Sequence, residues 1–125
     1  MNTIKEILEA YGTSVEEMDV NEHYLIEVDG YEPLAIEKVR EDIISVEQYY
    51  TQRMDRMSDP EIRFKIGDAG EWTAVEYTDH GMNVYQRDER GLRSANEFAI
   101  KWDRNLRDQG FIDAAYADAR NGGEQ

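Results

Sequence analysis

The sequence predicts an α+β fold: an antiparallel sheet meander of about five to six strands, with an N-terminal helix and a C-terminal helix packed on the sheet. Apolar residues recur at helical spacing near each end of the chain, and segments that alternate apolar with polar residues fill the middle. Short turn sequences separate those segments, which favours antiparallel neighbours. The 125 residues suggest one α+β domain over 1–119, followed by a flexible tail over 120–125.

The N-terminal helix is predicted over residues 3–11. Its apolar residues share one face: Ile4, Ile7, Leu8 and Tyr11. Thr3 and Glu6 have the spacing of a capping box, in which each side chain bonds the backbone of the other residue. Gly12 follows the last apolar residue, where a left-handed residue commonly ends a helix.

The C-terminal helix is predicted to begin at Ser94 and to end at Gly110. Ser94 and Glu97 have the spacing of a second capping box. An apolar stripe follows at four-residue spacing: Phe98, Trp102 and Leu106. Residues 111–119 are expected to add a further helical turn or two.

The middle of the chain contains six strand-like segments: 23–28, 34–39, 43–50, 61–66, 71–78 and 82–86. Alternation puts two sets of residues on single faces: Ile62, Phe64 and Ile66 in 61–66, and Trp72, Ala74, Glu76 and Thr78 in 71–78. The charged residues Glu61, Arg63 and Lys65 then form the solvent face of their strand.

The composition excludes several classes of protein. There is no cysteine, which excludes disulfides and thiolate zinc sites. No apolar run is long enough to cross a bilayer, and no cleavage-type leader is visible, so we expect a cytoplasmic protein without membrane contact. We expect no cofactor.

The net charge of −14 is the strongest global signal. The first 80 residues carry 20 of the 28 acidic residues and 7 of the 14 basic ones, whereas the rest of the chain is nearly balanced. Such a charge repels nucleic acid and attracts basic surfaces, so we expect a basic protein partner and no direct binding to nucleic acid. Solubility or adaptation to a salty cytoplasm would explain the same acidity.

No catalytic or metal-binding signature is present. His23 and His80 are the only imidazoles, and neither has the spacing of a metal site. No serine lies in the glycine frame of a nucleophile elbow. A metal-dependent nuclease would need convergent carboxylates, for which the candidates with Lys65 are Asp59, Glu61, Glu71 and Asp79.

The stretch EQYYTQRMDRMSDPE, residues 47–61, is predicted to be an ordered loop between two central strands. Tyr49 and Tyr50 are adjacent, so they point to opposite faces, and we expect one in the core and one exposed. Met57 is expected to anchor the loop together with the inward-facing tyrosine. Pro60 has a preset φ before the next strand.

This stretch resembles the central motif of a small domain family of unknown function that is encoded on plasmids and conjugative elements. The matching residues are Tyr49, Tyr50, Gln52, Asp55, Met57, Asp59, Pro60 and Glu61, with further blocks around Trp72 and at Trp102, Asn105 and Gly110. Family members often have Asn-Gly where this chain has Arg53-Met54. The resemblance implies a mobile-element context, often near antirestriction genes, and it provides no catalytic residues to carry over to this chain.

These observations lead to one main hypothesis and two alternatives. The main hypothesis is a non-enzymatic anti-defence protein that occupies the basic nucleic-acid groove of a restriction enzyme or CRISPR effector. The candidate partner-binding residues are Glu16, Glu17, Asp19, Glu47, Tyr50, Asp55, Asp59 and Glu61. The alternatives are a protein-interaction module in plasmid maintenance or transfer and, least favoured, a metal-dependent enzyme on nucleic acid. One continuous face of exposed acids would favour the inhibitor, and dispersed acids would favour the module.

Overall fold

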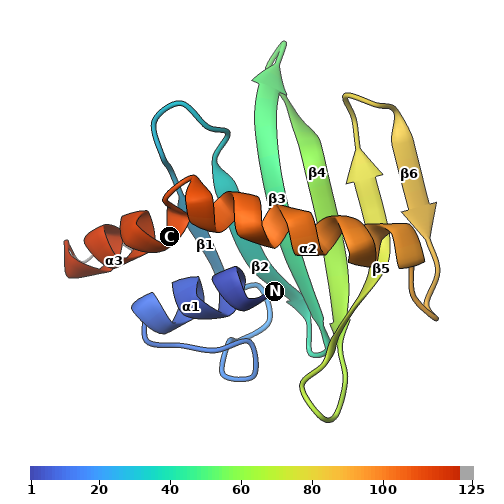
Figure 1. Cartoon of the computed structure of the whole chain (residues 1–125), viewed down its shortest axis with the longest axis horizontal. Helices are drawn as coiled ribbons and strands as arrows, with labels where there is room; N and C mark the ends of the chain where they lie inside the picture. The colour runs from blue at the N-terminus through green and yellow to red at the C-terminus, as the bar shows by residue number, and fades with distance from the viewer. Residues whose placement is uncertain (122–125) are drawn as a thin grey trace.

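The computed structural model describes residues 1–121, which form a two-layer α+β structure (Figure 1). Its strands are β1 (His23–Ile26), β2 (Leu34–Arg40), β3 (Ile43–Gln52), β4 (Asp55–Ile66), β5 (Trp72–Asp79) and β6 (Val84–Arg87). Its helices are α1 (Asn2–Ala10), α2 (Arg93–Asp108) and α3 (Phe111–Arg120). The strands pair antiparallel in the order β1-β2-β3-β4-β5-β6, which confirms the predicted meander. A second helix follows the predicted C-terminal one.

The helices lie on one face of the sheet, and α2 crosses the central strands (Figure 1). The core between the layers consists of alternate strand residues and the apolar stripes of the helices, including Ile36, Ile44, Val46, Ile62, Phe64, Ala99, Trp102, Leu106 and Phe111. Trp102 of α2 donates a hydrogen bond from Nε1 to Oε1 of Gln48 at 2.9 Å, and both side chains are buried. This bond ties α2 to the middle of the sheet.

The two glycines that were predicted to end helices do so in the structure. Gly12 follows α1 with φ of 79°, and the amide of Thr13 reaches back to the carbonyl of Leu8. Gly110, with φ of 93°, separates α2 from α3. A side chain is strained in this left-handed region, whereas glycine is not.

The two predicted capping boxes are wrong. Thr3 lies inside α1 and is fully buried. Its amide and hydroxyl bond Asp103 of α2 at 2.8 and 2.9 Å, so its side chain does not cap α1. Ser94 caps nothing, since α2 begins at Arg93 and its N-cap residue is Leu92. Asn96 secures this end of α2 instead, by accepting a bond from the amide of Ala74 at 2.8 Å.

The predicted loop within 47–61 is also wrong: β3 and β4 are continuous strands joined by a two-residue turn, Arg53-Met54. Both turn residues have positive φ, 52° and 71°. Two consecutive positive φ values are the signature of a type I′ turn, whose twist matches that of the strands and which favours Asn-Gly. The expectation of one core and one exposed tyrosine is also wrong, because Tyr49 and Tyr50 both lie in β3 of this long hairpin and both are half-buried.

The predicted faces of β5 hold only for its first half. Trp72 and Ala74 face the helices, but a bulge at Val75 shifts the alternation by one residue. Glu76 and Thr78 therefore point to the opposite face. The predicted tail, 120–125, lies outside the described residues from position 122 onward.

Replacing the turn with Asn-Gly (Arg53→Asn/Met54→Gly) is expected to stabilise the protein by about 1 kcal/mol, because both residues then adopt positive φ without strain. The free energy of urea unfolding measures the change. The control Arg53→Ala/Met54→Ala removes the same side chains but keeps a Cβ at each position, and should give no gain. Equal stability of the two variants would contradict the type I′ assignment.

Candidate functional site

The candidate site is the face of the sheet that the helices leave open. The strand register lines up two rows of side chains across this face. The first row runs from β2 to β6 as Glu37, Ser45, Arg63, Glu76 and Arg87. Because paired residues of neighbouring strands point to the same side, this row alternates acidic and basic groups around a serine.

The second row is Ala35, Glu47, Glu61, Thr78 and Tyr85. It places two glutamates directly opposite each other, an arrangement that destabilises a sheet unless other groups compensate the charge. The Tyr85 hydroxyl donates to Glu76 of the first row at 2.7 Å, which links the two rows.

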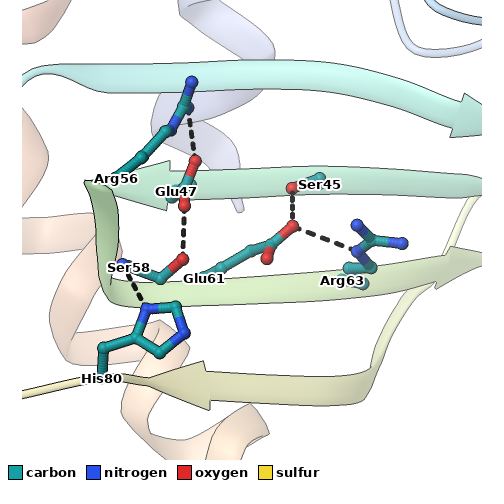
Figure 2. A network of polar contacts seen from close by, with 7 residues as sticks. All are labelled: Ser45, Glu47, Arg56, Ser58, Glu61, Arg63 and His80. Atoms are coloured by element: carbon teal, nitrogen blue, oxygen red, sulfur yellow. Dashed lines mark hydrogen bonds and ion pairs between the residues drawn. The ribbon is translucent and has the colours of Figure 1, made fainter. Parts of the chain in front are cut away.

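Each glutamate of the second row has its own pair of donors (Figure 2). Glu47 accepts hydrogen bonds from Arg56 and from the Ser58 hydroxyl. Glu61 accepts one from the Ser45 hydroxyl at 2.5 Å and one from Nε of Arg63 at 3.0 Å. The two glutamate side chains are only 12% and 19% exposed. Their charges are therefore compensated locally, within an ordered polar network.

His80 and Tyr49 fix the outer end of this network. The amide of Ser58 donates to Nδ1 of His80 at 2.7 Å (Figure 2). In return, the amide of His80 donates to the Ser58 carbonyl at 2.9 Å. The Arg56 guanidinium lies 3.8 Å from the centroid of the Tyr49 ring, in cation–π contact. Sequence patterns did not reveal these partners, because they meet only through the register of three strands.

A pocket of about 410 Å³ adjoins the network at the other end of the open face. Its charged lining residues are Arg40, Asp42, Arg63, Lys65, Glu76, Arg87 and Glu89, and its apolar ones are Val39, Ile43 and Val75. Four basic groups therefore converge in a protein whose net charge is −14. Arg63 belongs both to the pocket and to the network.

The predicted partner-binding residues are dispersed. Glu47 and Glu61 meet in the network, Tyr50 pairs with Met57 in the hairpin, and Asp55 begins β4 beside the exposed turn. Asp59 lies in a bulge of β4. The remaining three, Glu16, Glu17 and Asp19, are exposed on the loop between α1 and β1. The structure does not join the eight residues into one face.

The other motif residues are partly packed and partly exposed. Pro60 is buried in the β4 bulge, and Trp72 packs on Phe64 with ring centroids 5.3 Å apart. Gln52 ends β3 at the exposed turn, and Asn105 lies on the exposed side of α2.

Three carboxylates gather elsewhere: Glu32, Asp59 and Asp79. Burial and a hydrogen bond with Asp59, together with the charges of Asp59 and Asp79, raise the pKa of Glu32 to about 7. Of the nuclease candidates, Asp59 and Asp79 therefore lie together, but the others do not join them. Glu61 and Lys65 lie on the open face, and Glu71 folds over the β4–β5 turn, where it accepts a bond from the Ala69 amide. Within residues 1–121, no group of three or more histidines or carboxylates could hold a metal ion.

Ser58→Ala is expected to destabilise the protein by about 1–2 kcal/mol, because it removes a donor to the largely buried charge of Glu47. Ser94→Ala is the matched control: Ser94 is exposed and its side chain bonds none of residues 1–121, so the same change should be neutral or slightly stabilising. Chemical denaturation measures both. Equal effects would contradict the role assigned to Ser58.

Glu32 makes stability depend on pH. In the folded protein it keeps its proton up to about pH 7, whereas its ordinary pKa is 4.5, so the folded state binds more protons between these values. Stability is therefore expected to fall as pH rises through this window, by about 1 kcal/mol, because solvent screens this partly exposed group.

Glu32→Gln should remove that loss, which stabilises the protein at about pH 8 and leaves it unchanged at about pH 4. Urea unfolding at the two pH values tests this. Glu41→Gln, which changes an exposed acid in the β2–β3 turn, is the control and should show no such difference. A wild-type protein whose stability rises with pH across this window, with no gain from Glu32→Gln, would rule out the assignment.

Comparison with known proteins places the chain in a family. No curated protein and no solved structure matches the chain. Within residues 1–121, no helix is long and apolar enough to cross a membrane. A family model described as "Domain of unknown function (DUF6908)" matches residues 2–112. The chain therefore belongs to this family of domains of unknown function.

Proposed function

We propose that this chain is a non-enzymatic protein-interaction module of a mobile genetic element, and that it binds another protein through the open face of its sheet. The single observation that carries the proposal is the pair of ordered polar rows on that face, with a pocket beside them. The side chains of the network are held by one another, so a partner would meet a preorganised surface, at a low entropic cost of binding.

The placement of the predicted acids supports the module over the groove competitor. A protein that imitates nucleic acid needs its acids on one continuous surface. Here Glu47 and Glu61 are compensated by Arg56 and Arg63, and they are separate from the acidic loop after α1. The resemblance to domains encoded on plasmids and conjugative elements supports a role in plasmid maintenance or transfer.

Affinity capture from a host lysate tests the open face. The variant Glu37→Lys/Thr78→Lys changes one residue in each row of that face. Its control, Glu97→Lys/Ile100→Lys, makes the same change of charge on the exposed side of α2. We expect a protein that the wild type and the control retain and the face variant loses. Retention by the face variant and loss by the control would contradict the proposal.

The acidic loop supports a second candidate, the anti-defence inhibitor. Glu16, Glu17 and Asp19 are exposed on one segment, available to a basic groove. Inhibition of a captured nuclease should weaken steeply with added salt and with Glu16→Gln/Glu17→Gln/Asp19→Asn, since both weaken the electrostatic attraction. A captured nuclease that works at full rate with the wild-type protein at low salt would exclude this candidate.

A further inference from the structure

We propose that the pocket beside the network binds a carboxylate carried on an apolar body. The proposal deepens the proposed function, because the same face of the sheet would receive the ligand. It rests on the proposed function only if the carboxylate belongs to a protein partner. The pocket's volume of about 410 Å³ is within the size range of small-molecule sites.

The cations of the pocket are available to a ligand. Within residues 1–121, the side chains of Arg40, Lys65 and Arg87 make no ion pair and no hydrogen bond. In so acidic a protein, carboxylate partners are plentiful, yet these groups converge on a hollow without using them. A concave cluster of uncompensated cations attracts an anion.

Arg63 offers the ligand a pair of hydrogen-bond donors. Glu61 holds it through Nε, and Ser45 in turn bonds the same carboxylate oxygen (Figure 2). The two terminal nitrogens of Arg63 bond none of the described residues, so they present a fixed planar pair of donors beside the pocket. Such a pair matches the two oxygens of a carboxylate.

The remaining lining residues define the ligand further. Three acids, Asp42, Glu76 and Glu89, lie among the four bases, and Glu61 pairs with one of those bases, Arg63, so the net charge around the pocket is close to zero. That charge suits a singly charged carboxylate better than a doubly charged phosphate, and it disfavours a polyanion such as nucleic acid. Val39, Ile43 and Val75 supply an apolar wall for the rest of the ligand.

Titration of the ¹⁵N-labelled protein with benzoate, followed by NMR, tests the site. We expect saturable shifts of the amides of Ile43, Val75 and Arg87, with a dissociation constant on the order of 1–10 mM for so small a probe. Benzyl alcohol, which has the same ring and no charge, should bind much more weakly. Inorganic phosphate, at the same ionic strength, should also bind more weakly than benzoate.

The variant Lys65→Gln/Arg87→Gln should weaken benzoate binding about tenfold, because two charge-assisted contacts are lost. Lys101→Gln/Arg104→Gln is the matched control, since it removes two exposed cations from α2 and leaves the pocket intact. Equal weakening in both variants would show a general charge effect and overturn the proposal. So would stronger binding of phosphate or equal binding of benzyl alcohol.

Two peptides identify the source of the carboxylate. A four-residue apolar peptide is added with a free C-terminal carboxylate or with an amidated end. Tighter binding of the free peptide than of benzoate assigns the pocket to a protein partner's carboxylate, and weaker binding assigns it to a free small molecule. If the open face captures a partner but the pocket does not bind benzoate, only the proposal for the pocket is overturned. If the pocket binds benzoate but no protein is captured, only the proposed function is overturned.

Discussion

Burial of one face of the sheet under the helices is the constraint on which the rest of the structure depends. The bond between Trp102 and Gln48 holds α2 across the central strands, and the apolar alternate residues of those strands fill the space beneath it. Charged side chains on the strands are costly to bury, so most of them point to the other face. Lys38 and Asp79 are buried exceptions, and the amine of Lys38 is satisfied by the carbonyl of Val15 at 2.8 Å.

The strand register then determines which side chains meet on the open face. Two bulges, at Asp59-Pro60 in β4 and at Val75 in β5, decide which residues join the open face. The first brings Ser58 to the same face as Glu47, and the second turns Glu76 and Thr78 outward. Without the first shift Ser58 would point to the other face and could not donate to Glu47, and without the second shift Glu76 and Thr78 would leave the rows.

The fold was largely predictable because it follows from local periodicity and turn residues. Ile62 and Phe64 alternate in a run that fits only one face, and Gly12 and Gly110 end helices where their left-handed conformation is needed. The prediction of a capping box at Thr3 failed because Thr3 bonds Asp103 of α2 instead of its own helix. The prediction of a loop failed because Arg53 and Met54 adopt the positive φ values of a tight turn although both have side chains. The candidate site was predictable only for Glu47 and Glu61. Ser45 and Ser58 bond these glutamates, and His80 bonds Ser58, only because of the register between neighbouring strands.

The central claim is that the open face of the sheet is the binding surface. The most direct test places a photoreactive phenylalanine analogue at Thr78 on the open face and, in a separate protein, at Ile100 on the exposed side of α2. Irradiation in a host lysate is then followed by identification of the cross-linked protein. The account predicts a specific cross-linked product from position 78 and none from position 100. A specific product from position 100 alone would contradict it.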